Sequence, residues 1–372
     1  MISYNNILVI KLKQPGDVLL SSPVLAALKE AWPQARATYL VPRAAADMIR
    51  AHPLLDELLV ADRRQETWSR SWRLLQKLWQ AKYDLVLELS GGDRGAFFTL
   101  ATRAPERIGF ERPNQPYWQR QGVFTRLLPR PPVRMHMVEQ NLEAVRALGV
   151  RPQNPRLQFF WDDQAEVRVI RRLESLGLKP KNFAVMHPGA GWRFKCWTPV
   201  GYARVIEYVQ EVWQLPVLLT GSQASHEQEL IVEVLRECRV SPINLAGQLT
   251  LQELGALLDK ARFFFGVDSA PMHLAAAVNT PAVALFGPSG AFNWGPWGEG
   301  HLVIQKEMDC VPCGRDGCEG TKISRCLVEL TPEEVVAGME KHLGNKGGTA
   351  GLKPRPTDSD KPQGGSYGPR VG

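Results

Sequence analysis

A carboxylate and several cations occupy short segments that directly follow apolar runs of the chain. Asp17 comes after the apolar run Ile7–Leu12 and a Pro15-Gly16 turn. A strand, a tight glycine turn and a helix start form the geometry that receives phosphate in dinucleotide folds, yet a carboxylate would repel that anion. Asp17 is therefore a candidate general base for a substrate hydroxyl. The alternative is an N-cap of the following helix, and the two roles are compatible.

The segment "MHPGAGWRFKCW" also follows a strand pattern. Gly189 and Gly191 keep its backbone open to a ligand, and Arg193 and Lys195 add two cations. Because lysine acts as a point charge on phosphate, Lys195 is a candidate phosphate ligand. The alternative is a glycine-rich turn with solvated basic side chains.

A third segment, "FFFGVDSAPMHLAAAVNTPAVALFGPS", reads as a fully apolar strand followed by a helix. Asp268 or Ser269 can cap that helix. The free N–H groups of Ser269, Ala270 and Met272, together with the helix dipole, predict an anion site. His273 projects from the same first turn. One such segment can be purely structural, but three on one rim favour a ligand site.

Four cysteines lie within 17 residues: Cys310, Cys313, Cys318 and Cys326. Four thiols at this density can hold a structural zinc ion. The spacing lacks a second short CxxC, so we expect reduced thiols in a packed loop instead.

A stripe of tryptophans follows helical spacing at Trp68, Trp72, Leu75 and Trp79. Basic residues surround it: Arg63, Arg64, Arg70, Arg73 and Lys77. Packing in the core is the expected role of this face. The alternative is an interfacial helix that lies on an anionic membrane, with aromatic anchors and basic flanks.

The elements that must position these residues alternate along the chain. The expected strands are Ile7–Leu12, Thr38–Val41, Glu57–Val60, Leu85–Leu89, Phe183–His187, Val217–Thr220, Phe263–Val267 and Ala282–Phe286. The expected helices are Pro23–Ala31, Ala44–Ala51, Thr67–Trp79, Met137–Leu148, Asp163–Leu176, Pro199–Trp213, His226–Glu237, Leu251–Lys260, Pro271–Ala277 and Pro332–Leu343. Residues 108–132 read as loops. This alternation predicts an α/β fold with two parallel sheets.

Length and composition set limits on the class of protein. A chain of 372 residues with 44% hydrophobic content is expected to form two globular domains. No apolar run approaches the ~18–20 residues of a membrane span, and no secretory signal is visible, so we expect a cytoplasmic protein. The formal net charge of +7 suits an acidic small molecule or an anionic membrane surface, and we expect no nucleic-acid partner.

Two of these segments resemble the signature regions of a known enzyme family. "ILVIKLKQPGDVLLSSPVLAALKEAWPQA" and the segment around Asp268 are similar to those of glycosyltransferase family 9, the ADP-heptose:lipopolysaccharide heptosyltransferases. The resemblance runs from about Ile7 to Leu343, and "GAGWRFKCW" looks most like the heptosyltransferase III branch. It implies the GT-B fold, in which two Rossmann-like domains with parallel sheets face each other across a cleft.

The resemblance also assigns roles to individual residues. Asp17 matches the proposed base, with Gly16 on the acceptor side, and Lys195 matches the lysine that holds the diphosphate. The residues that match the donor-binding site are Asp268, Ser269, Ala270 and His273, with Gly189 beside them. Ala270 stands where the family usually has glycine. A glutamate usually contacts the nucleoside, and either Glu227 or Glu229 suits that role.

The implied reaction is an inverting, metal-independent transfer of heptose from ADP-heptose to the inner-core oligosaccharide of lipopolysaccharide. The lipid-anchored acceptor implies a peripheral enzyme at the inner face of the cytoplasmic membrane. The expected organisation is an acceptor domain over residues 1–160, a nucleotide-sugar domain over 161–331, a C-terminal helix over 332–345 and a disordered tail over 346–372.

Two other functional classes remain open at this level. One is a sugar-nucleotide epimerase or hydrolase on the same two-domain frame. The other is a non-enzymatic, nucleotide-binding or zinc-stabilised protein. Transfer to a heptose-deficient core separates the first from the expected enzyme, and turnover of an ADP-sugar separates the second.

Overall fold

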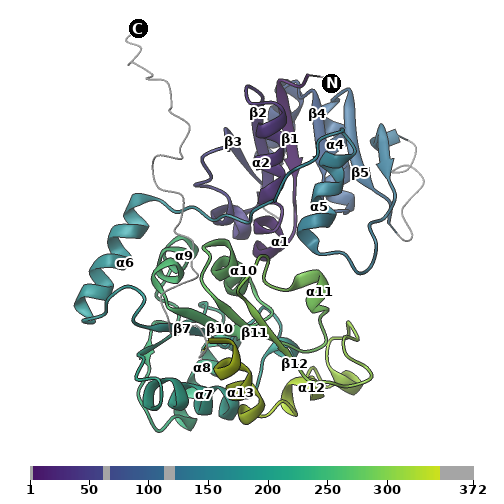
Figure 1. Ribbon diagram of the computed structural model, residues 1–372. Helices are drawn as coiled ribbons and strands as arrows, with labels where there is room; N and C mark the ends of the chain where they lie inside the picture. The colour runs from purple at the N-terminus through teal and green to yellow at the C-terminus, as the bar shows by residue number, and fades with distance from the viewer. Residues whose placement is uncertain (1–2, 62–67, 113–121, 344–372) are drawn as a thin grey trace.

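Each half of the chain forms one parallel, six-stranded sheet (Figure 1). The computed structural model describes residues 3–61, 68–112 and 122–343. Helices lie on both faces of each sheet, because parallel neighbours must be joined by connections that cross over the sheet. The predicted α/β class with two Rossmann-like sheets is confirmed.

The first lobe is built around β1, where the side chains from Ile7 to Ile10 are fully buried. A strand covered on both faces needs such an unbroken apolar run. The sheet order is β3-β2-β1-β4-β5-β6. Its strands are β1 Asn6–Ile10, β2 Arg36–Pro42, β3 Glu57–Ala61, β4 Leu85–Glu88, β5 Glu106–Phe110 and β6 Arg126–Leu128. Its helices are α1 Pro15–Leu19, α2 Ser22–Ala31, the 3-10 helix η1 Arg43–Met48, α3 Trp68–Gln80, α4 Asp93–Thr102 and α5 Met137–Arg146.

The second lobe has the sheet order β12-β11-β10-β7-β8-β9, with β10 and β7 at its centre. Its strands are β7 Ala184–His187, β8 Val217–Leu219, β9 Ile243–Asn244, β10 Phe263–Val267, β11 Ala282–Phe286 and β12 Leu302–Gln305. Its helices are α6 Asp163–Ser175, η3 Arg193–Lys195, α7 Pro199–Glu211, α8 Ser225–Glu237, α9 Leu251–Lys260, α10 Ala270–Ala277, α11 Ala291–Trp294, η4 Cys318–Gly320, α12 Arg325–Val328 and α13 Pro332–Leu343.

Side-chain caps fix where several of these helices begin. Thr198 caps α7 by accepting from the Gly201 N–H, and Asp162 caps α6 in the same way. Thr250 and Glu253 form a complete capping box at the start of α9. Each cap satisfies backbone N–H groups that the helix itself leaves unpaired.

The two lobes meet where α1 packs against α10 and η1 packs against α9 (Figure 1). Gln252 donates from Nε2 to the Asp47 carbonyl at 2.6 Å, and the Trp297 indole donates to the Pro155 carbonyl at 2.9 Å. One cluster of buried apolar side chains extends from the first lobe to α9 and α10. Because α1 follows β1 and α10 follows β10, the lobes meet at the carboxyl ends of their central strands.

The sequence patterns missed the shorter and more polar elements. Residues 108–132 were expected to be loops, but they hold the end of β5 and all of β6. Helix α4 and the edge strands β9 and β12 were also missed. The expected helix at Ala44–Ala51 is the shorter 3-10 helix η1. Edge strands of two to four residues carry too few apolar positions for a pattern to stand out.

The expectation that the tryptophan stripe packs in the core is wrong. Trp72 and Trp79 are exposed, Leu75 is half-buried, and the side chain of Trp68 lies outside the described residues. The neighbouring residue Leu78 reaches the core instead and packs in the cluster that contains Leu8 and Val86. Two helical faces are apolar in α3, and periodicity alone did not say which one meets the sheet.

The expected domain boundaries remain a prediction. The strands of the first sheet end at Leu128 and those of the second begin at Ala184, so a boundary near residue 160 is compatible with both sheets. The expected disordered tail falls outside the described residues. Among the residues that the structure describes, no helix combines the length and the apolar character needed to cross a bilayer.

Replacing two helical glycines by alanine should change the stability of the protein in opposite directions. A Cβ at Gly255 in α9 would stand 2.2 Å from Phe159 Cε1, whereas at Gly338 in α13 its nearest neighbour is Ile304 Cδ1, at 3.1 Å. Alanine normally stabilises a helix by about 1 kcal/mol relative to glycine. We expect Gly255→Ala to destabilise by about 1–3 kcal/mol because the ring must move.

Gly338→Ala is the matched control, because only the end of a flexible side chain has to shift. We expect it to be neutral or stabilising. Urea unfolding followed by tryptophan fluorescence measures both variants. Equal stabilisation by the two substitutions would show that Phe159 is not packed against α9 as described.

Candidate active site

Asp17 lies in the first turn of α1, at the junction of the two lobes. The N-cap of α1 is Gln14, so the alternative that Asp17 caps this helix is wrong. The Asp17 carboxylate instead accepts a hydrogen bond from the backbone N–H of Gln14. Its half-buried side chain feels the charges of Lys11 and Lys13 from its own lobe and of Lys195 from the second lobe.

Burial raises the pKa of Asp17, while the three neighbouring lysines and the Gln14 N–H lower it, and the effect of burial is the larger. A carboxylate with a raised pKa is a stronger base than an exposed aspartate. The side chain thus has the electrostatics expected of a general base.

Lys11 is a buried cation whose charge acts on Asp17, and no sequence pattern singles it out. Its Nζ donates to the Leu89 carbonyl at 3.0 Å and to Asn141 Oδ1 at 2.9 Å. Asn141 in turn donates to the Leu20 carbonyl at 3.1 Å. Burial lowers the pKa of Lys11 to about 8, while the charges of Asp17 and Glu88 raise it. Lys11 therefore carries a positive charge over most of the neutral range.

Lys195 and Asp268 form an ion pair at 2.6 Å in the second lobe. Lys195 is the last residue of η3 in the segment that follows β7, and Asp268 follows β10, the strand hydrogen-bonded to β7. Asp268 is buried, whereas about a quarter of the Lys195 side chain is exposed. An ammonium group has three donors, so this pair fixes the direction of Lys195 and leaves donors for a further anion.

The N-terminus of α10 lies directly after Asp268. Ser269 is its N-cap, but the Ser269 hydroxyl turns back to the Val267 carbonyl at 3.1 Å. The prediction that the Met272 N–H is free is wrong, because it donates to the Ser269 carbonyl at 3.2 Å. The backbone N–H groups of Ser269 and Ala270 are the remaining candidates for an anion at this end of the helix.

His273 connects this helix to the Asp17 turn. It is buried, and a Cβ at Gly16 would stand 2.9 Å from His273 Cδ2. Its Nδ1 has no hydrogen-bond partner among the described residues. Burial lowers the pKa of His273 to about 4, so the imidazole is neutral at physiological pH. The glycine is required here because α1 and α10 approach too closely for a larger side chain.

Glu227, at the start of α8, packs beneath the segment that carries Lys195. It accepts from the Ser222 N–H at 2.8 Å and pairs with His187 Nε2 at 3.4 Å. Burial alone would raise the pKa of Glu227, but His187 and Ser222 bring it down to about 2. A Cβ at Gly189 would stand 2.7 Å from the Glu227 side chain, so this glycine makes room for a carboxylate. Glu229 is exposed on the same helix.

A second bridge between the lobes runs through His136, a residue that no sequence pattern singles out. His136 caps α5 by accepting from the Val138 N–H at Nδ1, so its Nε2 carries the proton and donates to the Gly295 carbonyl at 3.0 Å. Asn293 of α11 donates to the Val133 and Met135 carbonyls, both at 2.7 Å. These contacts hold α5 and α11 together beside the site.

The four-cysteine segment gives no support for zinc. In the described part of the chain, no group of three or more histidine, cysteine or acidic side chains could hold a metal ion. Cys310 and Cys313 are exposed, and Cys326 is buried. The thiols are all free, but the exposure of Cys310 and Cys313 does not fit the packed loop expected from the sequence.

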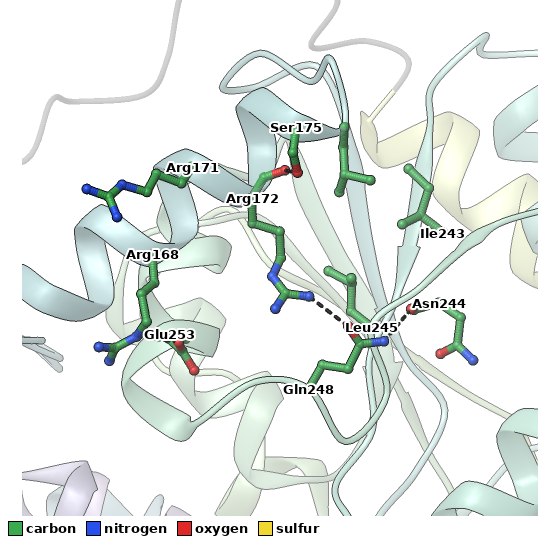
Figure 2. A pocket seen from close by; sticks show the side chains of 10 residues that line it. Arg168, Arg171, Arg172, Ser175, Ile243, Asn244, Leu245, Gln248 and Glu253 are labelled. Atoms are coloured by element: carbon green, nitrogen blue, oxygen red, sulfur yellow. Dashed lines mark hydrogen bonds and ion pairs between the residues drawn. The ribbon is translucent and has the colours of Figure 1, made fainter.

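A hollow of about 540 Å³ lies at the edge of the second sheet, between α6 and the segment after β9 (Figure 2). None of the predicted site residues lines it. Two of its arginines already have partners, since Arg168 donates to Glu253 at 2.6 Å and Arg172 donates to Gln248 at 2.7 Å. We therefore place the site at the lobe junction.

The model of glycosyltransferase family 9 (heptosyltransferase) matches residues 71–324. The chain belongs to glycosyltransferase family 9. It is 32% identical over 338 residues to lipopolysaccharide heptosyltransferase 3 of Escherichia coli K12, an alignment that covers 88% of this chain and 95% of that relative. The resemblance stated from the sequence is confirmed, and the protein is a glycosyltransferase.

Solved structures show the same fold. A family 9 glycosyltransferase from Veillonella parvula matches with a TM-score of 0.82 and 22% identity, covering 93% of this chain and 99% of that one. The E. coli ADP-heptose lipopolysaccharide heptosyltransferase II matches with a TM-score of 0.71 and 22% identity, covering 91% and 99%. At this identity the likeness supports the GT-B architecture alone.

The contact between Gly16 and His273 generates a prediction for glycosyl transfer. Gly16→Ala should push α1 and α10 apart by a few tenths of an ångström while each lobe stays folded. Since misplacement on this scale weakens catalysis, we expect kcat to fall by about tenfold or more. Steady-state kinetics measures this, with the unfolding midpoint as the test of folding.

Gly122→Ala is the matched control, because Gly122 lies outside the site segments and a Cβ there meets no atom within 4 Å. It should retain nearly full activity. A Gly16→Ala enzyme with unchanged kcat would show that the lobe contact described here is not part of the active arrangement.

Proposed function

We propose that this protein transfers a heptose from ADP-heptose to the inner-core oligosaccharide of lipopolysaccharide, with inversion at the anomeric carbon. The observation that carries the proposal is the opposition of Asp17 in the first lobe to the Lys195–Asp268 pair in the second. A relative that is 32% identical is named lipopolysaccharide heptosyltransferase 3, which supports heptose as the sugar and lipopolysaccharide as the acceptor.

In the proposed reaction, the Asp17 carboxylate takes the proton from an acceptor hydroxyl as that oxygen attacks the anomeric carbon. The leaving diphosphate departs from the opposite face, which inverts the centre in one displacement. Gly16 lies on the acceptor side beside Asp17. The raised pKa of Asp17 makes this proton transfer more favourable than it would be to an exposed carboxylate.

The second lobe neutralises the charge that builds on the departing ADP. Asp268 orients Lys195, whose remaining donors meet the diphosphate, and the N–H groups of Ser269 and Ala270 add the dipole of α10. Ala270 keeps its N–H although the family usually has glycine there. Neutral His273 packs against Gly16 of the Asp17 turn, and no step of the proposed reaction uses a metal ion.

For the nucleoside contact we assign Glu227 in preference to Glu229. The Glu227 side chain lies against Gly189, and Gly189 belongs to the segment that carries Lys195. The low pKa of Glu227 keeps its carboxylate ionised at every physiological pH. An ionised carboxylate accepts hydrogen bonds from ribose hydroxyls. We further propose that the protein works in the cytoplasm, at the inner face of the cytoplasmic membrane, because a lipid-anchored acceptor is presented there.

The first prediction of this proposal concerns Asp17→Asn. The amide cannot take the proton, so transfer from ADP-heptose to heptose-deficient core oligosaccharide should fall by about 10²–10⁴-fold. ADP affinity, measured by isothermal titration calorimetry, should stay within about threefold because the diphosphate lies on the second lobe. Parallel loss of ADP binding and transfer would instead indicate a structural role for Asp17.

The second prediction concerns the pH dependence of kcat/KM. The value of kcat/KM should rise with pH on the acidic limb of its pH profile. The midpoint of this limb should lie above the ordinary pKa of an aspartate, because the pKa of Asp17 is raised. Removing the Lys11 cation removes a charge that lowers this pKa. Lys11→Met should therefore move the limb to higher pH.

Lys13→Met is the control for this experiment, since Lys13 is exposed and lowers the pKa of Asp17 less than Lys11 does. It should move the limb in the same direction by a smaller amount. A limb that stays in place in a folded Lys11→Met enzyme would remove Asp17 as the titrating base.

A further inference from the structure

Four large apolar side chains are exposed together on the first lobe. Trp72 and Trp79 of α3 are 59% and 54% exposed, and Phe97 and Leu100 of α4 are 50% and 47% exposed. We call these four residues the α3–α4 surface. An exposed apolar patch of this kind usually marks an interaction site.

Each of the four side chains lies on a part of its helix that is exposed to solvent. The adjacent residues Leu78 and Phe98 pack in the buried cluster that also contains Leu8 and Val86 of the sheet. Trp72 and Trp79 are seven residues apart in α3, and Phe97 and Leu100 are three apart in α4, so each pair lies along one helical face. Helices α3 and α4 pack against each other.

A cation joins the two helices at their C-terminal ends. The Arg103 guanidinium, at the C-cap of α4, lies over the Trp79 ring at 5.5 Å from its centroid. An arginine stacked on an exposed tryptophan combines an apolar ring with a charge in contact with solvent. An aromatic ring and a positive charge of the α3–α4 surface are therefore in direct contact at Trp79 and Arg103.

The charge around the surface has one dominant sign. The sequence of α3 contains basic residues and no aspartate or glutamate, and α4 has a single carboxylate, Asp93, at its start. Arg73 and Lys77 are exposed on α3, although Lys77 also pairs with Glu57. A basic surface of this kind repels the same surface of a second copy of the protein, and it attracts a surface that carries negative charge.

We propose that the α3–α4 surface docks the enzyme on an anionic lipid bilayer. This inference rests on the proposed function, in which the acceptor is anchored in a membrane. Tryptophan and phenylalanine insert at the boundary between head groups and acyl chains, and arginine and lysine meet anionic head groups. The first lobe, which would hold the acceptor, is then the lobe that contacts the lipid.

The test is co-sedimentation of the full-length protein with vesicles. One set contains phosphatidylcholine alone, and the other contains phosphatidylcholine with about 30% phosphatidylglycerol, a fraction that gives a strongly negative surface potential. The wild type should bind the anionic vesicles, and binding should weaken as salt is raised. Trp72→Ser combined with Trp79→Ser should reduce the bound fraction at least tenfold.

Two further variants keep the result interpretable. Phe97→Ser combined with Leu100→Ser tests α4 by itself and should also weaken binding. Val212→Ser at the end of α7 removes an apolar side chain that is equally exposed, at 60%, on the second lobe, and it should bind as the wild type does. Unchanged unfolding midpoints show that each variant is folded.

Transfer to lipid-free core oligosaccharide separates this inference from the proposed function. The Trp72 and Trp79 double variant should retain that activity. Wild-type vesicle binding by the double variant would overturn the docking surface and leave the enzyme assignment intact. A wild-type protein that binds no vesicles and forms a dimer, with a monomeric double variant, would assign the surface to a second copy of the chain. This result would also overturn the proposal.

Discussion

The close approach of α1 and α10 at Gly16 and His273 is the constraint on which the site depends. Each helix follows the central strand of its own sheet, so the contact joins the carboxyl ends of β1 and β10 directly. It brings Asp17 of one lobe within electrostatic reach of Lys195 of the other. A larger residue at position 16 fits only if the two helices move apart, and a charged imidazole is disfavoured by burial.

The balance of charges around Asp17 follows from this contact between α1 and α10. Asp17 is partly removed from water, which disfavours its ionised form, and buried Lys11 compensates from beneath. Lys195 is oriented by Asp268 before any ligand arrives. In the proposed mechanism one carboxylate therefore accepts a proton, while a second carboxylate in the facing lobe only positions a cation, so that two residues of the same type have separate roles.

The fold class and most of the site segments could be predicted from the sequence, because β1, β10 and β11 are apolar runs that end abruptly at polar, glycine or proline residues. The edge strands β6, β9 and β12 could not, since they are too short and too mixed in composition. Lys11 and His136 were missed because their roles depend on partners more than 100 residues away, Asn141 and Gly295. The orientation of α3 was misjudged because two of its faces are apolar, and only the packing of Leu78 on the sheet decides between them.

In the proposed mechanism, proton removal belongs to the first lobe and the leaving group is bound by the second. A crystal structure of the protein with bound ADP tests this division most directly. We expect the diphosphate to contact Lys195 and the N–H groups of Ser269 and Ala270, with Asp17 facing it across an empty acceptor position. A diphosphate bound against the α1 turn of the first lobe, with Lys195 still paired only to Asp268, would contradict it.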